Sequence, residues 1–178
     1  MSANQLKTQR LTLRPVQASD AEAVVALAGD RDVARMTARI PHPYTMRDAE
    51  QWLGSVLAGA EIVFAILHED TFIGCAGYMP EGEGIAEFGY WIGKPYWNRG
   101  FATEAAVAVV KHALETDKMR VLTSGHFVDN PASGRVLEKL GFAREDEGLW
   151  PCAARGEQVP CVGYRLEAAG RRVAGGGD

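Results

Sequence analysis

The chain has 178 residues, 47% of them hydrophobic and 24% charged, with a formal net charge of −4. This length predicts one domain over 1–178, with a core at 10–167 and a disordered, polar and glycine-rich tail at 171–178. The negative charge argues against a nucleic-acid partner, and no apolar run is long enough to span a membrane, so we expect neither partner.

Cysteine usage indicates a reducing compartment. The three cysteines, Cys75, Cys152 and Cys161, are an odd set without a C-x-x-C pair. We therefore expect a cytoplasmic protein with buried thiols and no disulfide scaffold. Residues 1–5 contain no signal-peptide core, and no His, Cys or Asp cluster has metal-ligand spacing, so we expect no metal.

The N-terminal region predicts a strand followed by a helix. We expect residues 1–8 to be frayed, whereas residues 10–15 alternate polar and apolar as a strand does. Ser19 and Glu22 have the spacing of a capping box, in which each side chain bonds a free backbone N–H. The helix that follows is predicted to end near Gly29.

A loop with two prolines follows at residues 40–45. It cannot be helical, because proline restricts the residue before it. We expect it to form one wall of a substrate cleft, with His42 and Tyr44 as candidate substrate-binding residues. The alternative is that Tyr44 anchors the loop and His42 is exposed. Thr45 with Asp48 predicts the start of a second helix.

The middle of the chain predicts a sheet with one crossover. Residues 61–68, 72–79 and 87–93 are apolar or aromatic runs separated by turns, which predicts an antiparallel meander. A helical pattern begins at Phe101, and residues 120–128 are a further strand. Strand, helix and strand in this order imply a parallel pair, which binds ligands beyond its carboxyl ends.

The loop before that helix carries an anion-binding signal. Asn98, Arg99 and Gly100 come directly before the helix N-terminus, where unpaired N–H groups favour an anion. Gly100 lets the backbone approach a ligand closely, because it has no side chain. The alternative is that Gly100 is only a loop glycine.

The C-terminal region predicts a further helix and two closing strands. Asn130 and Pro131 are typical of a helix start, and Gly141 of a helix end. Residues 142–149 and 158–166 are predicted strands around a loop.

Two of these segments resemble the GCN5-related N-acetyltransferase (GNAT) family. The run Trp97-Asn98-Arg99-Gly100-Phe101-Ala102 resembles its Q/R-x-x-G-x-G/A loop, with tryptophan in place of the first Gln or Arg. The stretch from Glu87 to Glu104 is most similar to the RimJ/RimL-like branch. Residues 130–142 resemble the family's N-x-x-S/A…L-x-K-x-G-F helix.

The resemblance implies a fold and a cofactor. The fold is mixed α/β, with a mostly antiparallel sheet of about seven strands, one splayed parallel pair and about four helices. The cofactor is acetyl-CoA, with pantetheine along the backbone of one strand and pyrophosphate at the helix N-terminus. The implied cofactor-binding residues are Tyr90, Trp91, Ile92, Asn98, Arg99, Gly100, Phe101, Ala102, Thr103 and Asn130, the last of which also suits a helix cap.

Two residues are candidates for proton transfer. Glu87 is flanked by aromatic residues, and an apolar setting would suit it to act as a base; the alternative is a surface glutamate. Many family members place an acidic tyrosine where this chain has Leu137, so Ser133 is the candidate acid. The alternatives are that Ser133 bonds its own helix and that water protonates the thiolate.

The resemblance therefore predicts acetyl transfer to a primary amine by direct attack on the thioester. The acceptor is a peptide or protein α-amine or a small-molecule amine, and the sequence leaves open whether the protein is a monomer or a homodimer. A non-catalytic acyl-CoA-binding or regulatory domain is the alternative function.

Overall fold

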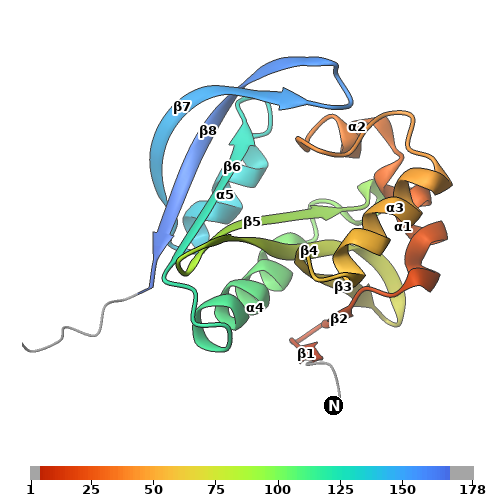
Figure 1. Ribbon diagram of the computed structural model, residues 1–178, viewed down its shortest axis with the longest axis horizontal. Helices are drawn as coiled ribbons and strands as arrows, with labels where there is room; N and C mark the ends of the chain where they lie inside the picture. The colour runs from red at the N-terminus through yellow and green to blue at the C-terminus, as the bar shows by residue number, and fades with distance from the viewer. Residues whose placement is uncertain (1–4, 169–178) are drawn as a thin grey trace, which may run out of the picture.

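The computed structural model describes residues 5–168, so the predicted tail at 171–178 lies outside the described residues. Eight strands form one sheet in the order β1-β2-β3-β4-β5-β6-β8-β7 (Figure 1). The strands are β1 Leu6–Lys7, β2 Leu11–Pro15, β3 Ile62–His68, β4 Thr71–Gly82, β5 Ile85–Ile92, β6 Val121–Phe127, β7 Ala143–Cys152 and β8 Glu157–Glu167. The helices are α1 Ala21–Ala28, α2 Arg31–Ala34, α3 Met46–Leu57, α4 Phe101–Glu115 and α5 Pro131–Lys139, with 3-10 turns at Ala18–Asp20 and Lys94–Tyr96.

The predicted mixed fold is confirmed. Every neighbouring pair of strands is antiparallel except β5 and β6, which are parallel. The described part of the chain has one strand more than expected, because Leu6 and Lys7, in the segment expected to be frayed, pair with Leu13 and Thr12. It also has one helix more, the single turn α2.

Helices cover both faces of the sheet because its strands alternate. Phe64 and Ile66 of β3 belong to the core cluster that contains α4, whereas Val63 and Ala65 belong to the cluster of α1 and α3. Figure 1 shows α4 on the opposite side of the sheet from α1 and α3. No helix within residues 5–168 combines the length and the apolar character that crossing a membrane requires. Each of the three cysteines is buried and free, as expected.

The two predicted caps have different outcomes. Thr45 and Asp48 form the predicted capping box at the start of α3, with the Thr45 N–H donating to the Asp48 carboxylate at 2.8 Å. The box predicted for Ser19 and Glu22 is wrong. Asp20 replaces it, and its carboxylate accepts a backbone N–H from three residues earlier, also at 2.8 Å.

The parallel pair separates after three residues. Ile85, Ala86 and Glu87 of β5 pair with residues 121–123 of β6. One residue later the Ser124 hydroxyl donates to the carbonyl of Phe88 at 2.9 Å and takes the place of a backbone hydrogen bond. Beyond it, β6 pairs with β8 alone, which leaves one edge of β5 open toward β6.

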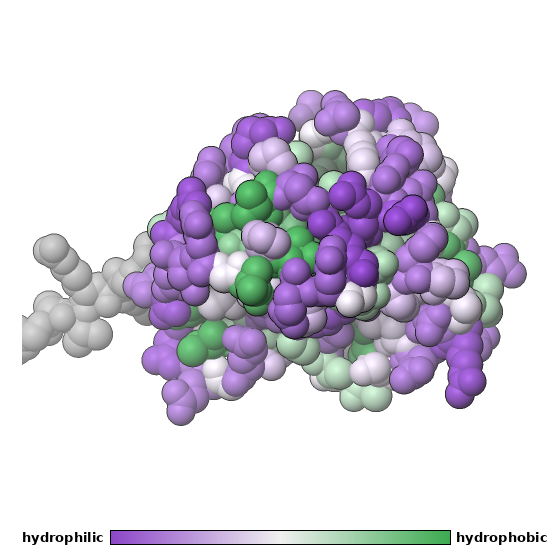
Figure 2. Space-filling model, turned by 90° about the horizontal axis from the view of Figure 1, so that it is seen from above, coloured by the Kyte–Doolittle hydropathy of each residue, from purple (hydrophilic) through white to green (hydrophobic). Residues whose placement is uncertain are grey.

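The β7–β8 hairpin reaches across to the segment after α2 (Figure 1). The Ala153 N–H donates to the Ala38 carbonyl at 2.9 Å. The Arg155 guanidinium donates to the Arg35 carbonyl at 2.9 and 2.7 Å and to both Asp129 carboxylate oxygens at 2.9 and 3.0 Å. Residues 35–39, here called the roof segment, are thereby held over the sheet. From above, apolar side chains gather among hydrophilic ones (Figure 2).

Candidate active site

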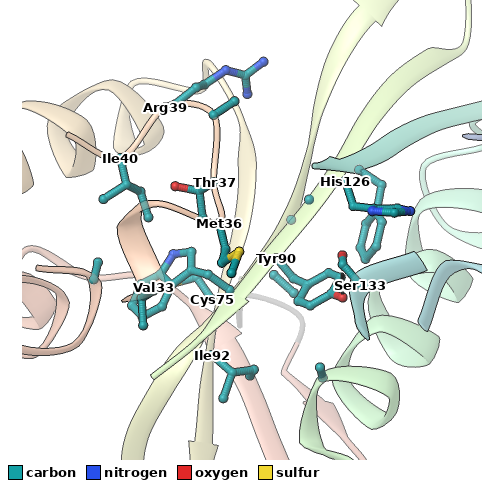
Figure 3. A pocket seen from close by; sticks show the side chains of 18 of the residues that line it. Val33, Met36, Thr37, Arg39, Ile40, Cys75, Tyr90, Ile92, His126 and Ser133 are labelled. Atoms are coloured by element: carbon teal, nitrogen blue, oxygen red, sulfur yellow. Dashed lines mark hydrogen bonds between the residues drawn. The ribbon is translucent and has the colours of Figure 1, made fainter. Parts of the chain in front are cut away.

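A cavity of about 980 Å³, here called the central cavity, lies between the roof segment, helices α1 and α3, and the open part of the sheet. Figure 3 shows β5 crossing it, with Arg39 at the upper edge. Two groups of side chains flank β5, an apolar one of Val33, Met36, Ile40 and Cys75 and a more polar one of Tyr90, Ser133 and His126. The cavity thus has an apolar half below the roof and a polar half beside α5.

The N-terminus of α4 opens into the polar half. Gly100 has φ 78°, a left-handed conformation that favours glycine, and it caps the helix. The N–H groups of Phe101, Ala102 and Thr103 donate to no acceptor within residues 5–168, as expected for a first helical turn. Asn98, Gly100 and these three residues line the central cavity, so the predicted anion-binding amides face it.

Arg99 does not line the cavity with the rest of its loop. Its guanidinium lies 4.9 Å from the centre of the Phe101 ring, and its carbonyl accepts from Arg10 at 2.9 Å. Glu104 also binds Arg10, and it accepts from the Thr8 hydroxyl at 2.6 Å. Burial opposes ionisation of Glu104, but the hydrogen bonds from Thr8 and Arg10 prevail and lower its pKa. The side chains of Arg99 and Glu104 therefore stabilise the loop from the side that faces away from the cavity.

Within the described residues, the backbone N–H and C=O of Tyr90 are free at the open edge of β5. Because backbone groups alternate along a strand, those of Phe88, Tyr90 and Ile92 point toward β6. The Phe88 carbonyl is taken by Ser124, and the Ile92 carbonyl accepts from the indole N–H of Trp97 at 2.7 Å. Of the three predicted pantetheine partners, Tyr90 therefore keeps its N–H and C=O available.

Trp91, another of the three, turns its backbone the other way. A methyl group on Gly74 of β4 would lie 2.2 Å from the Trp91 carbonyl oxygen, so this oxygen faces β4. Trp91 can contribute to the cavity wall through its side chain, but its backbone lies in the β4–β5 ladder. Sequence similarity could not separate Trp91 from its neighbours, because the alternation depends on the register with β4.

Tyr90 and Ser133 form a hydroxyl pair that the sequence did not reveal. The phenol oxygen of Tyr90 lies 2.9 Å from the Ser133 hydroxyl, which the first turn of α5 supplies. Burial raises the pKa of Tyr90, although the hydrogen bond to Ser133 acts in the opposite direction. Leu137, one turn further along α5, is fully buried in the core and contributes nothing to the cavity.

Asn130 precedes α5 and lines the cavity. Its side chain makes no capping hydrogen bond, while its backbone carbonyl accepts from the Ser133 N–H at 3.1 Å. Of the two roles considered from the sequence, the cap is therefore absent, and the amide group is available to a ligand.

Glu87 lines the cavity and is the last residue of β5 that pairs with β6. The expected apolar setting is not found, because the guanidinium of Arg39 lies 2.5 Å from Oε2 of Glu87. The Glu87 side chain is 34% exposed and that of Arg39 60%. Arg39 was missed because the two residues are 48 positions apart and the roof segment carries no motif.

The double-proline loop contributes one of its two predicted residues. Tyr44 lines the cavity, and burial, followed by the charges of Asp48 and Cys75, raises its pKa to about 12. His42 does not reach the cavity; it is exposed, and its Nδ1 lies 3.2 Å from the Gly29 carbonyl. Among residues 5–168, no three His, Cys, Asp or Glu side chains gather as a metal site.

Comparison with known proteins identifies the family. A family model described as an acetyltransferase (GNAT) domain matches residues 10–143. The chain belongs to the GNAT acetyltransferase family. The chain is 30% identical over 151 residues to the uncharacterized N-acetyltransferase YoaA of Bacillus subtilis (strain 168), which covers 79% of this chain and 83% of that protein.

Two further relatives agree with the RimJ/RimL-like branch of GNAT enzymes. A ribosomal-protein-serine acetyltransferase of Escherichia coli (strain K12) is 29% identical over 85 residues, or 47% of this chain and 48% of that one. The structure of RimL, a ribosomal L7/L12 alpha-N-protein acetyltransferase in complex with coenzyme A, has a TM-score of 0.81 at 17% identity. It covers 92% of this chain and 98% of that one, which shows the common fold. This GNAT protein is thus an acetyltransferase, and these two likenesses are consistent with the predicted branch.

Proposed function

We propose that this GNAT enzyme uses acetyl-CoA and transfers the acetyl group to a primary amine. One observation carries the proposal: the edge of β5 that faces β6 is open, and it leads from the free amides of α4 to Glu87 within one cavity. In this proposal the N–H groups of residues 101–103 hold the pyrophosphate, and the peptide group of Tyr90 pairs with pantetheine.

The chain's own groups have three tasks in the reaction. Glu87 accepts a proton from the amine, directly or through a water, while the amine nitrogen forms a bond to the thioester carbonyl carbon. The carbon–sulfur bond then breaks and leaves a thiolate. Ser133 donates a hydrogen bond to this sulfur, and the proton that completes the thiol comes through Ser133 or from water. Holding both reactants in one cavity supplies much of the acceleration.

The acceptor is a peptide N-terminus or a small-molecule amine. The E. coli relative and RimL are both named as acetyltransferases of ribosomal proteins, which supports a peptide acceptor. The cytoplasmic location and a homodimeric state stay predictions.

Ligand binding and turnover test this proposal separately. Acetyl-CoA and CoA are expected to raise the melting temperature, and ATP is not; a shift with ATP alone contradicts the proposal. Thiol release over a panel of amines then measures turnover. Glu87→Gln is expected to reduce kcat by about 10²–10⁴-fold, as for other general bases. Glu81→Gln, which alters an exposed carboxylate outside the cavity, is the matched control. Equal kcat in both variants would refute the role of Glu87.

A further inference from the structure

The carboxylate proposed as the base already has a cationic partner. Nη2 of Arg39 lies 2.5 Å from Oε2 of Glu87, on the cavity side of β5. Arg39 comes from the roof segment, which the hairpin holds through Arg155 and Ala153. The guanidinium therefore occupies the place that an incoming amine must reach, and this holds for any acceptor that uses Glu87.

When an acceptor amine takes the place of Arg39 beside Glu87, the local charge balance changes. Arg35 and Arg155 share the single carboxylate of Asp129, at 3.2 and 2.9 Å. With the Arg39–Glu87 pair, the roof region holds three guanidinium groups and two carboxylates. Once Glu87 faces the ammonium or amine of an acceptor, Arg39 loses its carboxylate partner at the cavity. A carboxylate that arrives with the acceptor would give Arg39 a new partner.

Other carboxylates that line the cavity do not supply this charge. Asp48 is held by the Thr45 hydroxyl and N–H at the start of α3, at 2.6 and 2.8 Å. Glu61 precedes β3, and within residues 5–168 Arg39 pairs with Glu87 and with neither Glu61 nor Asp48. Arg39, in contrast, is 60% exposed and can swing to a new partner without leaving a buried charge behind.

We infer that the acceptor carries a carboxylate close to its reacting amine and that Arg39 moves from Glu87 to this carboxylate when the acceptor binds. The inference rests on the proposed function. An arginine fork suits a carboxylate because it donates two parallel hydrogen bonds. Consecutive Cα atoms are about 3.8 Å apart, so a carboxylate in the first or second residue of a peptide is within reach. A free amino acid presents the same chemistry.

The wild-type enzyme and matched acceptors test this exchange. One pair of peptides differs only in aspartate or asparagine at the second position, and a second pair of acceptors is free alanine and alanine amide. Partly exposed ion pairs contribute modestly, so we expect kcat/KM to be about three- to tenfold higher for the carboxylate member of whichever pair is used. A preference within the peptide pair alone assigns a peptide acceptor, and one within the free pair alone an amino acid.

Two variants locate the effect. Arg39→Ala is expected to bring the kcat/KM ratio of the preferred pair close to one, and Arg39→Lys to keep part of the preference. Arg47→Ala, which removes an exposed arginine outside the cavity, is expected to leave the ratio unchanged. Because the wild-type ratio is itself a test, the inference stays open to refutation even if an Arg39 variant folds poorly.

The outcomes separate the inference from the proposed function. If acetyl-CoA binds but no acceptor releases thiol, the proposed function fails. If thiol is released at equal kcat/KM from both members of each pair, the function holds and the inference about Arg39 is overturned. A preference that survives in Arg39→Ala also overturns it.

Discussion

The Tyr90–Ser133 pair gives the sharpest prediction about the reaction. The two oxygens are 2.9 Å apart, and either hydroxyl can donate to the other. If Tyr90 donates, the hydrogen of Ser133 is free to point at the leaving sulfur. Tyr90→Phe removes this constraint and keeps the ring, whose centre lies 6.0 Å from that of Phe88. Its effect on turnover should therefore pass through Ser133.

The size of the effect follows from one neutral hydrogen bond. Such a bond contributes about 0.5–1.5 kcal/mol, which corresponds to about a two- to twelvefold fall in kcat. Ser133→Ala is expected to reduce kcat at least as much. Because both variants break the same arrangement, the double variant should be no slower than Ser133→Ala, which is the signature of coupled residues.

A double-mutant cycle measures this coupling at saturating acetyl-CoA, with CoA affinity as a second readout. CoA affinity is expected to change little, since the proposed pyrophosphate and pantetheine contacts come from backbone groups. Tyr164→Phe is the matched control, because its phenol donates to Glu138 of α5 at 3.2 Å but lies outside the cavity. Additive effects of Tyr90→Phe and Ser133→Ala would refute the reasoning.

Three further predictions concern the elements around the site. Gly100→Ala places a side chain at φ 78°, which costs about 1–2 kcal/mol of folding free energy. We therefore expect a melting temperature lower by about 2–8 °C and weaker CoA binding by calorimetry. An unchanged melting temperature together with unchanged CoA affinity would contradict the role of this turn. Glu104→Gln should destabilise the protein by about 1 kcal/mol in urea unfolding at pH 7. Because folding lowers the pKa of Glu104, the stability that its carboxylate contributes is fully present above the ordinary pKa of 4.5 and should be lost as pH falls through the lowered pKa. A stability difference between wild type and Glu104→Gln that persists in acid would refute this. Arg155→Lys loses the pair of hydrogen bonds to the Asp129 carboxylate. In steady-state kinetics it should raise the KM for the amine more than the KM for acetyl-CoA. Equal changes in the two KM values would argue against a role of the hairpin in acceptor binding.

Local signals predicted which residues gather in the half of the cavity that we propose binds the cofactor. The strand at Glu87, the loop with Gly100 and the helix start at Asn130 each carry their pattern within a few neighbouring residues. The cap at Thr45 was predictable for the same reason. The box at Ser19 and Glu22 failed because Asp20, which fits the same local chemistry, is drawn into a pair with Arg14 at 2.7 Å. A sequence pattern can name competing caps without deciding between them.

The acceptor half could not be predicted, because distant segments build it. The hydrogen bond between Arg39 and Glu87 spans 48 positions, and those between Arg155 and the Arg35 carbonyl span 120. Neither contact has a period or a spacing, and each depends on how the hairpin curves over the sheet. This division has a functional consequence. If the proposed function holds, we expect a cofactor site built from adjacent backbone groups to tolerate changes such as tryptophan at position 97, and a single substitution in the roof segment to alter which amine reaches Glu87.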